Sequence, residues 1–225
     1  MMITRRGALA LTGAAAATLA APAIVRAAAP FTKPPLPYGA DALEPHISAR
    51  TMAIHADIIH QSAYDRLNAL VTGTDYADMA LEEVVQASAE AAEFDVYSNA
   101  AEAWNHDLYF AQFAGGWSTP GPILDEMLGR EFGGLDGLAD QLVETAGTVF
   151  GDGWVWLTVE GDALFLEGWH DAGNPIGSGR QIIFGADLWE HAYFLDRETR
   201  RADYLRAIVT ELVNWDAMEQ TLMDG

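Results

Sequence analysis

The chain has 225 residues, of which 50% are hydrophobic, so it can bury a core as one large domain or two small ones. It contains no cysteine, which excludes disulfides, thiolate metal sites and cysteine nucleophiles and leaves His, Asp and Glu as metal ligands. The net charge of -21 opposes binding to nucleic acid or anionic lipid, so we expect no nucleic-acid partner and no stable membrane association.

Residues 1–29 have the pattern of a twin-arginine signal peptide. Arg5 and Arg6 precede an apolar, alanine-rich run from Ala8 to Val25, and small residues follow it. The alternative, a membrane anchor, is disfavoured by Pro22 and by the short run. Cleavage would remove three arginines and no acid, changing the net charge from -21 to -24. We expect a bacterial periplasmic protein that uses the twin-arginine export machinery.

Helical periodicity begins after a proline-rich lead-in, residues 30–37. Apolar residues at helical spacing predict a helix from Ser48 to Val71, and the segment Thr72–Asp75 breaks it. A second helical region, from Ala80 to Phe113, is predicted in two pieces. This half of the chain is therefore expected to be all-helical.

The stretch from Gly115 to Pro122 is rich in glycine and proline and predicts a boundary between two lobes. We assign residues 30–116 to an N-terminal α-helical hairpin domain and residues 117–225 to a C-terminal α+β domain. In that domain the residue patterns predict helices over 123–132 and 135–150, strands over 154–160, 163–169 and 181–184, and helices over 188–195 and 203–223. The predicted fold class is α+β, a helical hairpin followed by an α/β domain with a small three-stranded antiparallel sheet.

Asp187 and His191 are the most informative pair of residues in the chain. They stand four residues apart, so in a helix or tight turn both side chains project from one face and can hold one metal ion. A chance Asp-x-x-x-His is common, but two further histidines upstream and several tryptophans nearby strengthen the interpretation.

Several segments, in the same order along the chain, resemble the iron/manganese superoxide dismutase family. They cover essentially everything after Leu36. The matching segments are Tyr38–Ser48, Met52–His55, Ala101–His106, Gly151–Leu157, the Asp187–His191 stretch, Tyr204–Leu205 and Leu212–Trp215. The resemblance implies the fold of that family.

The resemblance also implies an activity, the conversion of superoxide to dioxygen and hydrogen peroxide. It implies one iron or manganese ion per subunit, with iron favoured, in a hard, nitrogen-rich site. The implied metal ligands are His55, His106, Asp187 and His191. An aromatic shell would exclude bulk water and stiffen these ligands. The residues that match this shell are Trp104, Trp154, Trp156, Trp189 and Tyr193.

The resemblance further favours a homodimer. Glu190 matches the residue that crosses the dimer interface of the family to a ligand histidine, here His191 of the other chain. Arg201 falls on the arginine at the mouth of the family's substrate channel, which would attract the anion superoxide.

The chain departs from the family in the helix that carries His55. The family has a lysine and a histidine where Ile58 and Ile59 stand, and its gateway tyrosine corresponds to Ala63. Tyr64 comes one residue later, about 100° further round a helix, so it should point elsewhere. His60 lies about 140° from His55 on such a helix and is expected at a structural interface instead of on the same metal ion.

Glu102 is the second departure. It occupies the position of the outer-sphere glutamine of iron-type members, and Ala172 stands at the manganese-type alternative. An ionised glutamate only accepts hydrogen bonds, so we expect an altered redox poise. Glu102 also lies one turn from His106, where it could serve as a fifth ligand. The plain alternative is a surface glutamate.

The sequence therefore predicts a superoxide dismutase whose activity is reduced by these departures, with Glu102 and Arg201 as candidate catalytic residues. The alternative is a superoxide dismutase-like metal-binding protein with little dismutase activity, which would hold metal, sense it or serve another redox reaction.

Overall fold

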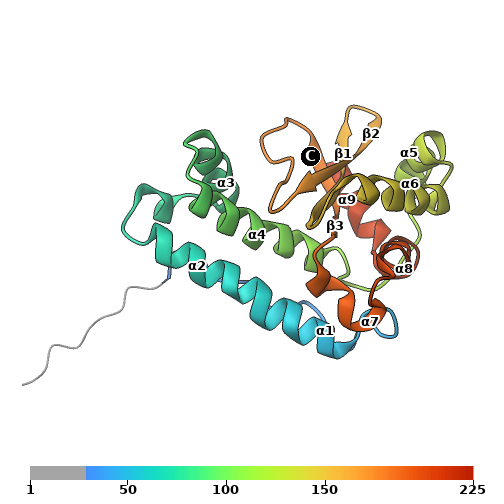
Figure 1. Cartoon of the computed structure of the whole chain (residues 1–225). Coiled ribbons are helices and arrows are strands. Elements are labelled where there is room, and N and C mark those ends of the chain that lie inside the picture. The colour runs from blue at the N-terminus through green and yellow to red at the C-terminus, as the bar shows by residue number, and fades with distance from the viewer. Residues whose placement is uncertain (1–28, 225) are drawn as a thin grey trace, which may run out of the picture.

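The structure is a computed structural model that describes residues 29–224. A layer of long helices lies beside a lobe that contains a small sheet (Figure 1). The expected signal peptide lies outside the described residues, apart from Ala29. Between residues 29 and 224, no helix is long and apolar enough to cross a bilayer.

The N-terminal lobe is built from two long helical arms that run in opposite directions (Figure 1). The first arm is continuous, as predicted for the segment from Ser48 to Val71. Its parts are α1 (Ala49–Ile54), η1 (His55–His60) and α2 (Gln61–Val71). The second region is in two pieces, as predicted. The short turn η2 (Asp75–Asp78) leads into this region, and its two pieces are α3 (Leu81–Glu90) and α4 (Phe94–Ala111).

The first arm widens into a π-helix at η1. Backbone bonds of a π-helix span five residues, so residues five apart lie on the same side. His55 and His60 therefore both meet the aromatic ring of Phe110 on α4, at 4.9 and 5.5 Å between ring centroids. His60 is buried, with its Nε2 2.9 Å from Asp107 Oδ1. His60 is not one of the four converging metal-binding candidates among residues 29–224, and it packs between η1 and α4 in the structural role that was expected of it.

The C-terminal lobe contains a three-stranded antiparallel sheet flanked by helices. In chain order its elements are α5 (Pro122–Phe132), α6 (Leu135–Thr148), β1 (Gly153–Glu160), β2 (Ala163–His170), β3 (Gln181–Asp187), η3 (Glu190–Ala192), α7 (Phe194–Arg197), α8 (Arg201–Ala207), η4 (Ile208–Leu212) and α9 (Trp215–Asp224). Helix α6 packs against β1 and β2, and α4 and α9 pack against β3. The α+β class and the small antiparallel sheet are confirmed.

The strand order β2-β1-β3 places β1 in the centre of the sheet. In its register Trp154 stands opposite Asp187, the last residue of β3. Trp156 stands opposite Gly185, and a Cβ at Gly185 would lie 2.3 Å from the Trp156 ring. Only glycine fits there, so β3 lies flat against the central tryptophans.

Two helices predicted near the C-terminus are shorter than expected. Instead of a helix over 188–195 the chain forms the 3₁₀ turn η3 and the four-residue α7. The Asp187 carboxylate accepts a hydrogen bond from the Trp189 N–H at 2.7 Å, a local bond that competes with helix formation. The helix predicted over 203–223 is interrupted at Asn214, which bonds the Ala217 N–H at the start of α9.

Three amide side chains join the two lobes. Gln112, just past α4, donates to the Gly185 carbonyl at 2.9 Å and accepts from its N–H at 3.2 Å. Asn105 donates to the Ala172 carbonyl at 3.1 Å and accepts from Asn174 at 2.8 Å. Helix α4 is thereby fixed both to β3 and to the loop that follows β2.

Candidate metal centre

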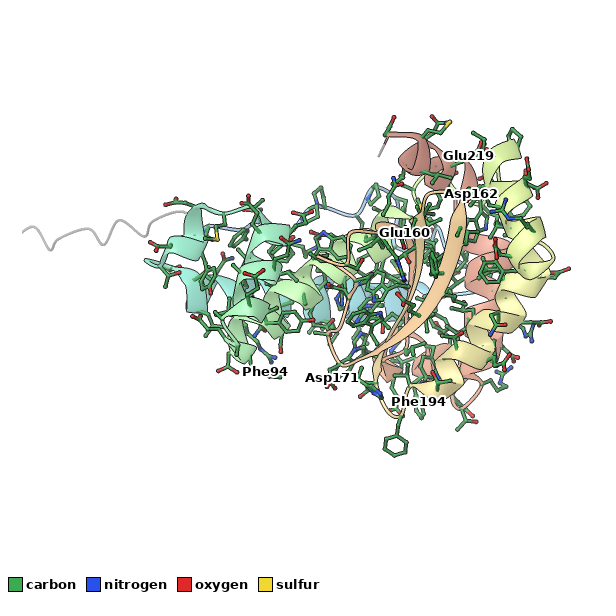
Figure 2. All side chains as sticks on the ribbon, turned by 90° about the horizontal axis from the view of Figure 1, so that it is seen from above. Phe94, Glu160, Asp162, Asp171, Phe194 and Glu219 are labelled. Atoms are coloured by element: carbon green, nitrogen blue, oxygen red, sulfur yellow. The ribbon has the colours of Figure 1, made fainter. Side chains whose placement is uncertain are left out.

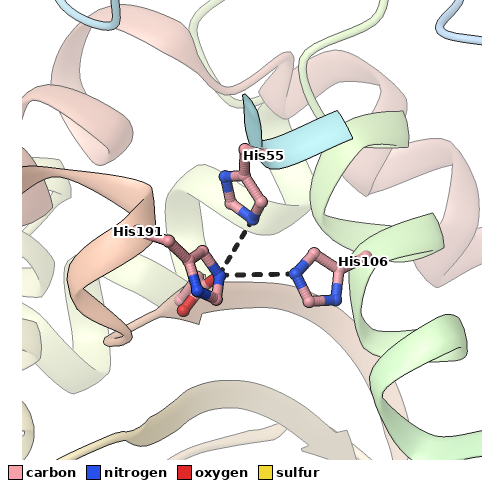
Figure 3. Close-up of side chains that lie close together, drawn as sticks. His55, His106 and His191 are labelled. Carbon is pink, nitrogen blue, oxygen red and sulfur yellow. Dashed lines mark hydrogen bonds and ion pairs between the residues drawn. The ribbon is translucent and has the colours of Figure 1, made fainter. Parts of the chain in front are cut away.

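Four buried or half-buried side chains converge where the two lobes meet. His55 comes from η1, His106 from α4, Asp187 from the end of β3 and His191 from η3. One donor atom of each lies within 4.8 Å of the others. Figure 3 shows the three imidazole rings turned toward one another. The structure thus brings together all four ligands that the sequence predicted.

The Asp187 carboxylate lies at the centre of the group. Its Oδ2 is 3.1 Å from His55 Nε2, 3.1 Å from His191 Nε2 and 3.8 Å from His106 Nε2. Donor atoms bound at about 2.1 Å from one ion are separated by about 3 to 4 Å, so these spacings fit a shared metal.

Local bonds orient two of these ligands. His106 Nδ1 lies 2.7 Å from the Glu102 carbonyl oxygen, one turn earlier on α4. Donation of the Nδ1 proton to that carbonyl leaves the Nε2 lone pair directed at Asp187. The other carboxylate oxygen of Asp187 is held by the Trp189 N–H. Both residues are therefore positioned by backbone groups.

The electrostatics of the group favour neutral imidazoles at His55 and His106 and an ionised carboxylate at Asp187. Burial lowers the pKa of His55 to about 4 and lowers the pKa of His106 well below its usual range. Burial alone would raise the pKa of Asp187, but His191 and His55 outweigh it and hold that pKa well below its usual range. Neutral imidazole and carboxylate are the forms that bind metals.

The donor set fits an iron or manganese ion. Three imidazole nitrogens and one carboxylate oxygen suit first-row divalent and trivalent metals. Within residues 29–224, His55 Nε2 and His106 Nε2 are buried and make no hydrogen bond. Buried polar atoms are rarely left without a partner, and a bound cation would satisfy both.

Aromatic rings surround the four ligands, though not all of the predicted ones touch them. Trp154 lies 5.2 Å from the His106 ring and Trp189 stacks on His191 at 5.8 Å. Trp156 stacks on Trp154, and Trp104 lies 5.8 Å from Trp156, so these two form a layer behind the first. Buried Tyr193 stacks on Tyr204 at 5.5 Å.

Two aromatic neighbours of His55 were not predicted. Tyr109 and Phe110 lie 5.1 and 4.9 Å from its ring. They follow His106 by three and four positions on α4, the spacing at which helix residues share a face. That spacing was the signal available in the sequence.

A cavity of about 230 Å³, the site cavity, opens onto two of the ligands. The residues that line it come from η1, α2, α4 and the turn after β3. They are Ile59, Ser62, Ala63, Arg66, Asn99, Glu102, His106, Trp189 and His191. A small molecule in this cavity reaches the metal ligands without any rearrangement of the backbone.

Glu102 faces the site cavity instead of open solvent. Its Oε2 lies 3.4 Å from His106 Nδ1, the ring nitrogen turned away from Asp187. Burial, reinforced by the charge of Asp187, raises the pKa of Glu102 well above its usual range. Glu102 is not one of the four converging residues between 29 and 224, so the structure gives no support to a fifth-ligand position.

The gateway position is empty of any large side chain. Ala63 lines the site cavity, whereas the Tyr64 hydroxyl donates to Asp107 Oδ2 at 2.5 Å. Tyr64 therefore points elsewhere, as its offset of one residue predicted. Asp107, which is half-buried, also contacts His60, so a His–Asp–Tyr group lies behind His106, and no residue pattern had indicated it.

The two remaining candidates lie outside the site cavity. The Arg201 guanidinium donates to the carbonyls of Ala146 and Gly151 at 3.1 and 3.4 Å. It is not among the residues that line the cavity. Glu190 is exposed beside His191, which is itself half-buried.

Comparison with known proteins gives matches along both lobes. Residues 30–114 match the family model described as iron/manganese superoxide dismutases, alpha-hairpin domain, and residues 120–221 match the C-terminal domain model of the same family. A superoxide dismutase [Fe] of Synechocystis is 36% identical over 194 residues, covering 85% of this chain and 98% of the relative. One from Legionella pneumophila is 37% identical with the same coverage. A superoxide dismutase [Mn/Fe] of Porphyromonas gingivalis is 37% identical, covering 82% of this chain and 95% of the relative.

Replacement of Asp187 by Asn tests the metal centre. Asp187→Asn removes the charge but keeps an acceptor for the Trp189 N–H, so the chain should fold and bind metal at least about 100-fold more weakly. Metal content after dialysis, measured by mass spectrometry, should fall from about one ion per subunit to a small fraction. The matched control is Asp203→Asn on exposed α8, which should retain metal. Full metal content in Asp187→Asn would contradict the assignment.

Proposed function

Because the chain belongs to the iron/manganese superoxide dismutase family, we propose that it is an exported, iron-dependent homodimer of that family. The protein is a superoxide dismutase, which converts superoxide to dioxygen and hydrogen peroxide at a mononuclear site of three histidines and one aspartate. The single observation that carries this function is the convergence of four donor atoms within 4.8 Å at the junction of the two matched domains.

An iron ion held by His55, His106, Asp187 and His191 would supply the redox couple by which one superoxide is oxidised to dioxygen and a second is reduced to hydrogen peroxide. Two protons are consumed for each hydrogen peroxide formed. The chain contributes the surroundings of this chemistry. His55 and His106 stay neutral because they are buried, and Trp154 and Trp189 cover His106 and His191.

Glu102 distinguishes this site from one that has a glutamine there. Its two carboxylate oxygens are buried at the site cavity and have no hydrogen-bond partner among residues 29–224. When ionised it adds a negative charge beside an anionic substrate, and it cannot donate a hydrogen bond. Together with the absent tyrosine at Ala63, this supports a reduced rate of dismutation.

The choice of iron over manganese rests on the similar proteins. Most of the relatives given above carry the name superoxide dismutase [Fe], although one is named [Mn/Fe]. Glu102 also stands on α4, at the position where iron-type members carry their glutamine. Both points favour iron.

Reconstitution with iron and with manganese tests the function. We expect measurable dismutation in the iron-loaded protein and less in the manganese-loaded protein. At pH values above the raised pKa of Glu102, where its carboxyl is ionised, Glu102→Gln should raise the rate about tenfold, because the amide donates a hydrogen bond and removes a charge. Ala63→Tyr should raise it further. Glu93→Gln, on an exposed glutamate just before α4, is the matched control. Iron-loaded protein no more active than aqueous iron would contradict the function.

A homodimer is supported by the surface beside His191. Glu190 is exposed there, and Phe194 and Leu195 are 45% and 50% exposed. Large exposed apolar side chains next to a functional residue are typical of an interaction surface. Figure 2 shows Phe194 at the periphery of the molecule, at a distance from Phe94 on the helical lobe.

Sedimentation of two phenylalanine variants tests this interface. The wild-type protein should sediment at twice the mass of one chain, whereas Phe194→Asp should shift it toward the monomer, because a charge in an apolar interface is costly. Phe94→Asp changes a phenylalanine that is 78% exposed on the other lobe and should remain dimeric. Equal behaviour of the two variants would place the interface elsewhere.

Export is supported by the arginine pair and the apolar run that follows it. The family match begins at residue 30, directly after the expected cleavage region. Arg5→Lys combined with Arg6→Lys should leave full-length protein in the cytoplasm. Protein recovered from the periplasm of wild-type cells should begin near residue 30 by N-terminal sequencing. A periplasmic protein that still begins at Met1 would contradict cleavage.

A further inference from the structure

The substrate is an anion, yet the chain carries a net charge of -21. Such a charge repels superoxide at long range unless a nearby cation offsets it at the point of approach. The arginine expected to do this, Arg201, is bound to two backbone carbonyls away from the site cavity. Ile58, at the position of a lysine in the family, is apolar. The attraction must therefore come from another residue.

Arg66 is the one cationic side chain, among residues 29–224, that lines the site cavity. It is exposed, and it takes part in none of the ion pairs formed within this part of the chain. Its guanidinium is therefore available to an anion from solvent. Arginine suits this use because it stays charged and presents several N–H donors in a fixed plane.

The position of Arg66 follows from helix geometry. Ile59, Ser62, Ala63 and Arg66 recur at the spacing of one helix face and form one wall of the site cavity. The facing wall of the site cavity is formed by three residues of α4, which are Asn99, Glu102 and His106. Asn99 lies almost two turns from the ligand His106. Arg66 is likewise the last cavity-lining residue on its own helix face, eleven residues after the ligand His55. It therefore lies at the outer end of the site cavity, the end away from the ligands.

Ala63 leaves the path from Arg66 to the ligands open. It is separated from Arg66 by about 4.5 Å of helix rise, and its side chain is a single methyl group. Tyr64, the nearest large side chain, is held by Asp107 outside the site cavity. The two residues of this wall that neighbour Arg66, Ala63 and Ser62, are therefore both small, and His106 and His191 line the same cavity.

We propose that Arg66 is the substrate-recognition residue of this chain, which draws superoxide into the site cavity and orients it at the outer end. The inference rests on dismutation at the four-ligand site. The anion is thus attracted by helix α2 of the helical hairpin, and not by the segment around Arg201.

Two variants with the same charge change separate a local contact from net charge. Arg66→Gln removes the cavity cation, and Arg50→Gln removes an exposed arginine of α1 that does not line the cavity. In the full-length, iron-loaded protein, Arg66→Gln should lower the second-order rate constant for superoxide about fivefold at about 10 mM ionic strength. The loss should vanish near 1 M, where the Debye length is about 3 Å. Arg50→Gln should change the rate little.

Azide binding supplies a second readout that does not depend on turnover. Azide is a small monoanion, and its dissociation constant is measured from the absorbance change of the iron-loaded protein. Arg66→Gln should raise this constant about fivefold, Arg66→Lys should recover most of the affinity, and Arg50→Gln should leave it unchanged.

Equal azide affinity in Arg66→Gln and wild type would overturn the inference, as would equal rate losses in the two glutamine variants. If the wild-type protein proves unable to dismutate superoxide, the proposed function fails, and the azide constants still judge Arg66 separately. Matching melting temperatures of the variants show that folding is preserved.

Discussion

The structure depends on one buried carboxylate held among three imidazoles. Asp187 is fully buried, and a buried charge without partners is among the costliest features a protein can carry. His55 and His191 each approach its Oδ2 to 3.1 Å, and the Trp189 N–H binds its other oxygen. The same burial keeps His55 and His106 neutral. The polar partners of this carboxylate therefore come from both lobes, because neither lobe contains all four residues.

The connections between the lobes serve this requirement. Helix α4 carries His106, and its amide side chains bind the loop after β2 and the backbone of β3 two residues before Asp187. The π-helical segment η1 turns His55 and His60 toward the same helix. A hydrogen-bonded frame thus orients the donor atoms of the site, which is how selective metal sites are generally built.

The sequence predicted most of the fold and the ligands, and its failures have physical reasons. Regular periodicity located the long helices, and residue patterns located the strands near their observed positions. The helix expected over 188–195 fails because the Asp187 side chain competes for a backbone N–H. The π-helical geometry of η1, which turns His55 and His60 toward the same helix, is a feature that no local pattern indicates. Arg66 was overlooked since its importance depends on two helices meeting, which is a tertiary property.

The contact between Gln112 and Gly185 has a consequence beyond the positioning of Asp187. Strand β3 is an outer strand, and such strands offer unpaired backbone groups that can recruit strands of other molecules. The Gln112 amide occupies both the donor and the acceptor of Gly185, as a neighbouring strand would. A single side chain therefore occupies one position on the open edge of this strand at which the backbone of another molecule could otherwise pair.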